Sequence, residues 1–224
     1  MKNKLLLAIL LSTVFTNVMA QSAFEGFYGQ VGVGYEKVSP STSLSITVPS
    51  VQASAFDFTT NVNSANSYIG VITLGYNYKI TNEFLLGVGA EYEPFAGSKG
   101  TYTLSNSTFG TISGTYQKKS SYNFFVSPGY VIDKDKLAYA KVGYTGAKSV
   151  SDGQDTVDLK GYSFGLGYKQ TIQAGLYGYV EGNYLKYGDT TDNSSGTISG
   201  RAATSSSTQS ANAYNFIIGL GYKF

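Results

Sequence analysis

The residues that could do chemistry are charged side chains spaced along apolar segments. Glutamates and lysines stand at alternate positions between large apolar or aromatic residues. Because successive side chains of a strand point to opposite faces, we expect these charges to share the inner face of a sheet whose outer face is apolar. The predicted interior polar network consists of Glu36, Lys79, Glu91, Glu93, Lys141, Lys169 and Glu181.

Unpaired charges in an enclosed interior are costly, so we expect these glutamates and lysines to pair and to share hydrogen bonds. Two functions fit such a network. It could form an ion or proton path, or a gate, or it could be a polar plug that fills the interior. If the sheet closes into a barrel of eight strands, its interior has room for little more than the inward side chains. Such a narrow interior favours the plug.

Catalytic and metal chemistry find less support. The chain has no histidine and no cysteine, and hydrolases commonly activate a nucleophile or water through histidine. A Ser-Lys or paired-aspartate device stays open, but no spacing favours one. Asp152, Asp155 and Asp158 could hold Ca²⁺ through oxygen ligands, yet they lack the full pattern of a calcium loop. We therefore predict no enzyme activity, no cofactor and no metal.

The first twenty residues have the pattern of an export signal. Lys2 and Lys4 precede an apolar run from Leu5 to Leu11, and Val18-Met19-Ala20 offers small residues for cleavage. We predict cleavage after Ala20, which leaves 21–224 as one domain. No cysteine follows the cut, so a lipoprotein anchor is excluded. No later segment approaches the ~20 apolar residues of a spanning helix, so a membrane-spanning form must be a closed barrel.

The composition limits the classes of partner that the protein can bind. The formal charge of +2 comes from Lys2 and Lys4 alone, because 16 Lys/Arg less these two leaves 14 against 14 Asp/Glu. A neutral mature chain argues against nucleic-acid binding, which needs a basic face. The 20 tyrosines, 13 phenylalanines and 27 glycines are typical of sheets with interfacial aromatic rings.

Eight segments alternate with a period of two, and short and long connections separate them in turn. The short ones lie near Thr81-Asn82, Asp133–Asp135 and Gln170–Gln173, and the long ones are rich in Ser, Thr and Gly. This rhythm predicts an all-β, eight-stranded, antiparallel, up-and-down transmembrane β-barrel with short periplasmic turns and long extracellular loops. The predicted strands cover about 27–37, 68–80, 84–93, 122–132, 138–144, 162–169, 176–184 and 214–224.

We assign no secondary structure to the long connections, about 38–67, 96–119 and 188–210, except that 44–51 alternates enough to extend a hairpin above the membrane. Pro128 within the fourth strand indicates an edge or a bulge. The second loop carries lysines and the third carries aspartates, so we expect the two to attract each other weakly at the outer rim. The lysines are Lys99, Lys118 and Lys119.

The strand motifs are similar to those of a known family. They include Gly32-Val33-Gly34-Tyr35, Gly75-Tyr76-Asn77-Tyr78 and Gly165-Leu166-Gly167-Tyr168, and the chain closes on Gly219-Leu220-Gly221-Tyr222-Lys223-Phe224. With the export signal and eight strands, the chain resembles the OmpA/OmpX-type outer-membrane β-barrels, including the opacity-like surface proteins. The resemblance implies a bacterial outer-membrane location, with lipid and lipopolysaccharide as surroundings. It also implies that Gly219, Tyr222 and Phe224 form the signal read by the barrel assembly machinery.

The function that the resemblance favours is structural and surface-facing. It would serve envelope integrity, or adhesion to a host or other surface ligand through the loops, in a self-contained monomer. The alternative is a narrow, low-conductance, porin-like channel. A lipid-modifying or proteolytic enzyme is disfavoured by the missing histidine. A lipocalin-like binder is disfavoured because it would keep its apolar face inside.

Overall fold

The computed structural model describes residues 23–51, 55–152 and 155–224, so the predicted signal peptide, 1–20, and its cleavage site lie outside the described residues. The described chain is built from strands. They are β1 (Gly26–Thr47), β2 (Phe56–Asp57), β3 (Thr59–Val62), β4 (Ala65–Lys79), β5 (Phe84–Glu93), β6 (Lys99–Asn106), β7 (Gly110–Asp133), β8 (Lys136–Ser151), β9 (Asp155–Gln173), β10 (Leu176–Ile198) and β11 (Arg201–Lys223). No helix in these ranges is long and apolar enough to cross a membrane.

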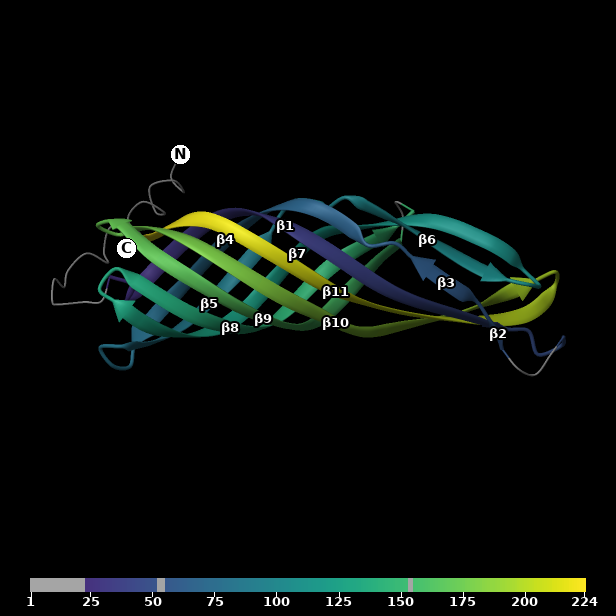
Figure 1. Cartoon of the computed structure of the whole chain (residues 1–224). Helices are drawn as coiled ribbons and strands as arrows, with labels where there is room; N and C mark the ends of the chain where they lie inside the picture. Colours follow the sequence, from purple (N-terminus) through teal and green to yellow (C-terminus); the bar gives the residue numbers. More distant parts are fainter. Residues whose placement is uncertain (1–22, 52–54, 153–154) are drawn as a thin grey trace, which may run out of the picture.

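Eight of these strands close into a ring. In the order β1, β4, β5, β7, β8, β9, β10 and β11, each strand pairs antiparallel with the next, and β1 pairs with β11 to complete the circle. The closing seam is long and regular, from Tyr28 opposite Lys223 to Thr47 opposite Thr204. Figure 1 shows the tilted strands, with the start of β1 and the end of β11 at the end that carries the short turns. The predicted up-and-down barrel is confirmed.

Two girdles of aromatic rings mark the membrane span. On five strands, an outward-facing aromatic side chain near the short turns has a second outward-facing aromatic side chain eight positions away on the same strand. The pairs are Phe27 and Tyr35, Tyr68 and Tyr76, Phe84 and Tyr92, Tyr122 and Tyr130, and Tyr214 and Tyr222. At ~3.3 Å per residue the two girdles lie about 26 Å apart along a strand. With both rings counted, each stretch contains about nine residues, which is the length of a tilted strand that crosses a bilayer.

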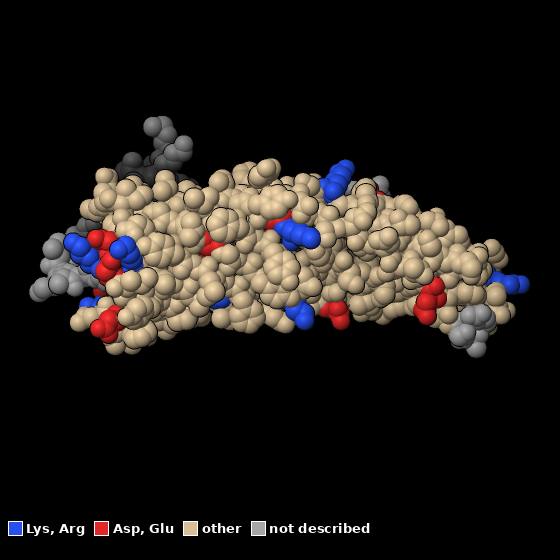
Figure 2. Space-filling view, viewed as in Figure 1, with Lys and Arg blue, Asp and Glu red and all other residues tan. Residues whose placement is uncertain are grey.

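Exposed Val, Ile and Leu side chains fill the band between the girdles. Val31, Ile72 and Leu166 are 61%, 49% and 70% exposed, so the apolar face points away from the interior, as the alternation predicted. In Figure 2 the corresponding surface is largely free of charged residues, which gather at the end with the termini and reappear along the other half. Lipid is the solvent that suits such a surface.

The long connections stand on the extracellular side, as expected, but they are not irregular. The stretch 188–210 continues β10 and β11 as a hairpin that turns at Ser199 and Gly200, whose φ values are both positive (50° and 74°). β1 likewise runs on to Thr47, and β6 forms a hairpin with β7. Assigning no structure to these stretches was wrong. Their Ser/Thr composition was read as loop, but hydroxyl pairs across strands, such as Thr191 with Thr208 at 2.9 Å, stabilise sheets.

The extracellular wall is therefore a continuation of the barrel wall with added strands. β6 pairs with β7, β3 with β6, and β2 with β1. The pairing of β9 with β10 ends at Gly161 and Tyr187, while β9 continues beside β8 and β10 beside β11. The edge or bulge expected at Pro128 is absent. Pro128 lies opposite Leu86 of β5, and the register between β7 and β8 is the same at Val126 and at Gly129, although no residue pairs are formed between these two positions.

Candidate functional site

The middle of the barrel is filled by a buried group of charges, the mid-barrel cluster of Lys141, Glu91 and Glu181. The Lys141 ammonium lies 3.0 Å from Glu91 and 2.5 Å from Glu181. Glu181 also accepts hydrogen bonds from the Tyr139 hydroxyl and the Asn183 amide, at 2.7 and 2.8 Å. These residues come from strands β5, β8 and β10, so only the closed ring brings them together.

A second group, the upper cluster, lies at the level of the outer girdle. Lys118 is 2.5 Å from Glu36 and 2.6 Å from Glu93, and Ser121 donates a hydrogen bond of 2.8 Å to Glu93. The interior network predicted from sequence included both glutamates but not this lysine. We had placed Lys118 in a loop, and that assignment was wrong because the residue belongs to β7.

A β-bulge explains why Lys118 was missed. Along β7 the buried positions are odd from Ser121 to Ser127 but even at Tyr116 and Lys118. The register with β8 shifts between Lys118 and Ser120, so Lys119 is the extra residue and stays exposed. A bulge inserts one extra residue into the strand, so the inward-facing positions change from odd to even numbers across it. Strict alternation would have sent Lys119 inward, and no local signal in the sequence announced the shift.

Lys169 and Lys79, the other predicted members, take part in neither cluster. The buried Lys169 ammonium lies over the rings of Tyr28, Tyr139 and Tyr177, at 4.1, 4.9 and 5.3 Å from their centroids. Cation–π attraction to three rings stabilises its charge. Lys79 is half-buried at the periplasmic end of β4.

The periplasmic mouth is closed by the segment that leads into β1. Phe24 is 1% exposed and packs edge-on against Tyr177, with ring centroids 6.0 Å apart. Its carbonyl accepts a hydrogen bond of 2.7 Å from the Asn77 amide. Leu85 and Leu137 belong to the same apolar cluster. The described lumen is thus occluded at three levels, by Phe24, by the mid-barrel cluster and by the upper cluster.

The residues predicted as an assembly signal lie at the end of β11. Tyr222 and Phe224 face outward and pack edge-on, with centroids 5.5 Å apart. Gly219 lies where the backbone of Val31 and the Tyr179 ring approach closely, so a side chain there would collide with both. These contacts explain a structural role. Recognition by assembly machinery stays a prediction.

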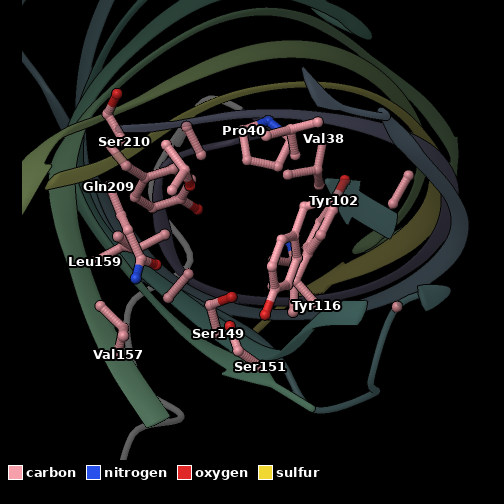
Figure 3. Close-up of a pocket in the computed structure, with 18 of the residues that line it drawn as sticks. Val38, Pro40, Tyr102, Tyr116, Ser149, Ser151, Val157, Leu159, Gln209 and Ser210 are labelled. Atoms are coloured by element: carbon pink, nitrogen blue, oxygen red, sulfur yellow. The ribbon is translucent and has the colours of Figure 1, made fainter. Parts of the chain in front are cut away.

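Above the upper cluster the extracellular strands enclose a cavity of about 390 Å³, which we call the vestibule. Lys118 and Tyr187 lie at its base, where apolar side chains such as Val38, Leu159 and Ala211 also face it. Figure 3 shows Tyr102 and Tyr116 side by side on one wall, with Ser149 and Ser151 next to Tyr116 and with Gln209 across the cavity.

The two tyrosines of this wall are seated by a repeated tripeptide. Gly100-Thr101-Tyr102 on β6 pairs with Gly114-Thr115-Tyr116 on β7, so each tyrosine lies opposite the other strand's glycine. A Cβ on either glycine would overlap the facing ring. The repeat is the sequence signal that could have found this wall. The Ser/Thr-rich composition of 96–119 hides this signal, because it favours a loop over a hairpin.

Asp152, at the end of β8, fastens the tyrosine wall. Its carboxylate accepts hydrogen bonds of 2.7 Å from the Thr115 amide and 2.7 Å from the Tyr102 hydroxyl. Its own amide donates to the Thr115 carbonyl at 2.8 Å. The Thr115 amide and the Tyr102 hydroxyl together lower the pKa of the Asp152 carboxyl, because both stabilise its charged form. We call this set of bonds the Asp152 latch.

The second and third connections therefore meet, but not through the charges we expected. Among the described residues no ion pair joins Lys99, Lys118 or Lys119 to the aspartates of the third connection. Lys118 is occupied inside the barrel, and Asp152 binds neutral groups. The described residues also contain no group of three acidic side chains that could hold a metal ion.

Comparison with known proteins gives structural matches only. Neither the protein-family models nor the curated proteins contain a match. Among solved structures, the outer membrane protein OprG from Pseudomonas aeruginosa is 14% identical, with 89% of this chain and 96% of that chain covered and a TM-score of 0.57. The outer membrane protease OmpT from Escherichia coli is 10% identical, with 93% and 100% covered and a TM-score of 0.51. Neisserial surface protein A is 15% identical, with 89% and 98% covered and a TM-score of 0.49.

The likeness to OprG and OmpT agrees with the closed ring and its girdles. The chain has the fold of a small eight-stranded β-barrel of the kind found in the outer membrane. The predicted resemblance is confirmed at the level of architecture. Identities this low say nothing of activity, and one of the similar structures is a protease, so the fold alone does not exclude an enzyme.

Proposed function

We propose that this protein is a closed, surface-facing barrel of the bacterial outer membrane, whose extracellular β-structure serves envelope structure or contact with other surfaces. The observation that carries the proposal is the contrast between a lumen occluded at three levels and a wall that continues far beyond the membrane. From Tyr35 in the outer girdle to Thr47, β1 continues for roughly 40 Å at ~3.3 Å per residue.

The proposal includes a monomer in contact with lipid and lipopolysaccharide, without enzymatic activity. A self-contained ring leaves no barrel edge within the membrane to be covered by a partner. Histidine and cysteine are absent from the whole sequence, and the charged groups of the two clusters pair with one another rather than exposing a nucleophile with its base.

Contact through the extracellular strands can be tested by shortening the β10–β11 hairpin. Deleting 192–197 together with 202–207 removes six facing pairs and keeps the turn at Ser199 and Gly200. Because the register below is unchanged, we expect the shortened barrel to fold and to retain its heat-modifiable mobility on gels. Cells carrying it should lose most surface adhesion or become detergent-sensitive. Normal behaviour in both assays, with normal protein levels, would contradict the proposal.

A narrow channel is the second candidate, because the vestibule leads to the upper cluster and then to the mid-barrel cluster along the axis of the barrel. Conductance in a planar bilayer separates the two functions. We expect silence from the refolded barrel and from a Glu91→Ala/Glu181→Ala variant, since the upper cluster and Phe24 still block the path. Steady single-channel steps that the variant alters would make the lumen a path and overturn the closed barrel.

A further inference from the structure

The vestibule has the composition of a binding site rather than of a packed core. Its volume of about 390 Å³ falls in the range of roughly 300–1,000 Å³ that small-molecule sites occupy. The barrel below it is filled by side chains, whereas the side chains around it are mainly Ser, Thr, Gln, Val and Ala. Figure 3 shows the labelled side chains arranged around an open centre.

One wall of the vestibule is a flat aromatic surface that is fixed before any ligand arrives. The hydroxyls of Tyr102 and Tyr116 are both engaged, the first with Asp152 and the second with the Asn63 carbonyl at 2.5 Å. The facing glycines Gly100 and Gly114 leave each ring one position to occupy. Both hydroxyls are therefore held by the protein, and both rings line the vestibule. A preorganised surface of this kind lowers the entropic cost of binding.

Side chains next to the tyrosines and across from them offer hydrogen bonds. Ser151 lies beside Tyr116 and Ser149 beside Lys118 on the neighbouring strand β8, whereas Gln209 faces the vestibule from β11. Within the described residues, no hydrogen bond joins these three side chains to other protein groups. Elsewhere on the extracellular strands, hydroxyls bond across the sheet, as Ser105 does with Thr111 at 3.1 Å. Alcohol and amide groups that are left free on one side of a cavity can pair with a polar ligand.

The base of the vestibule offers no free cation to an anion. Lys118 is the member of the upper cluster that lines the vestibule, and its ammonium is already held by Glu36 and Glu93. Asp192 adds a negative charge to the lining. A phosphate, sulfate or carboxylate therefore has no unpaired positive partner among the described lining residues. A ligand that matches all the walls is uncharged, has a flat apolar face and carries hydroxyls at its edges.

We propose that the vestibule binds a neutral carbohydrate unit of one or two sugar rings. One face of the sugar stacks on Tyr102 and Tyr116, and its hydroxyls bond to Ser149, Ser151 and Gln209. This inference rests on the proposed surface-facing function and names the class of ligand that the surface would contact.

Saturation-transfer NMR on the refolded barrel in detergent tests the site, with lactose, maltose and N,N′-diacetylchitobiose as probes. We expect transfer to at least one neutral disaccharide. Ser149→Phe fills the cavity and should abolish it, whereas the matched change Ser43→Phe, at an exposed position of β1 outside the lining, should leave it unchanged. No transfer from any neutral disaccharide at millimolar concentration would overturn the proposal.

A second pair of variants separates stacking from mere folding of the wall. Tyr102→Phe keeps the ring and loses the bond to Asp152, and Tyr102→Leu loses both. Binding should survive in the first and fall at least tenfold in the second. Equal loss in both would remove the stacking role. A sulfated disaccharide or an apolar dye that binds in place of neutral sugars would also overturn the assignment. None of these outcomes touches the conductance and hairpin tests, so the two proposals fail separately.

Discussion

The lumen within the membrane and the vestibule outside it are two parts of one tube with opposite interiors. Inside the membrane, Lys141 and Glu181 have side chains only 1% and 5% exposed, and each charge has a partner. Outside, small hydroxyl side chains surround an open cavity and many have no protein partner. The same strands build both walls, since β1, β7, β8, β9, β10 and β11 contribute to each.

This difference shows that the size of the inward-facing side chains, and not the number of strands alone, decides whether the interior of a barrel is filled. Eight strands leave space for side chains alone when those side chains are Tyr, Lys and Glu. Where the inward positions become Ser, Ala and Val, and where β6 and β3 widen the wall, the same architecture leaves a cavity. The membrane part is therefore suited to stability and the outer part to contact.

The largest expected effect is on the mid-barrel cluster. Lys141→Met leaves Glu91 and Glu181 as buried, unpaired charges, and breaking such a group costs about 3–5 kcal/mol. The urea midpoint of the refolded barrel, followed by gel mobility, should fall accordingly. The triple variant Lys141→Met/Glu91→Gln/Glu181→Gln should recover most of the loss, because no charge is left unpaired. Equal loss in both variants would mean that packing, not charge, is responsible.

Lys118→Met sharpens the comparison at the boundary between the two regions. The upper cluster adjoins the vestibule, so water can reach Glu36 and Glu93 when the lysine is gone. We expect the urea midpoint to fall less than in Lys141→Met measured beside it. A fall as large or larger would contradict the idea that the base of the vestibule is accessible to water.

The Asp152 latch should respond to pH without affecting the barrel. Its folded-state pKa lies below the ordinary Asp value, so its stabilisation is complete above about pH 4 and is lost as the pH falls further. Hydrogen exchange at the Thr115 amide checks this. Exchange corrected for intrinsic rate should be constant from pH 8 to 5 and should rise below pH 4. Asp152→Ala should give fast exchange at every pH, while amides between the girdles stay protected.

The smallest effect is expected at the exposed pair of Lys136 and Asp133. Their separation of 2.7 Å resembles those in the buried clusters, yet both side chains are 43% exposed. Water screens such a pair and side-chain entropy offsets it. Lys136→Ala should leave the urea midpoint unchanged within error. A clear fall would show that distance alone ranks these ion pairs, and the contrast between buried and exposed regions would lose its basis.

Much of the fold could be predicted from the sequence, because the face of a strand to which a side chain points depends only on its neighbouring residues. Alternation at Val31, Leu74 or Ile218 identifies the lipid side, and Asp133–Asp135 identifies a turn. The turn expected at Gln170–Gln173 was misplaced, because these residues belong to β9 and the turn follows at Ala174-Gly175. The extracellular strands were missed because Ser and Thr serve in loops and in sheets alike, and cross-strand partners such as Thr208 for Thr191 lie far along the sequence.

The candidate site divides in the same way. The sequence by itself determined an eight-stranded barrel, its outward apolar face and most of its inward charges, since a period of two needs only neighbouring residues. The tertiary structure alone decided that Lys118 turns inward at a bulge, that Lys141 meets Glu91 and Glu181, and that Tyr102 and Tyr116 face a cavity. Those contacts join strands that are distant in sequence, and only closure of the sheet fixes which residues meet.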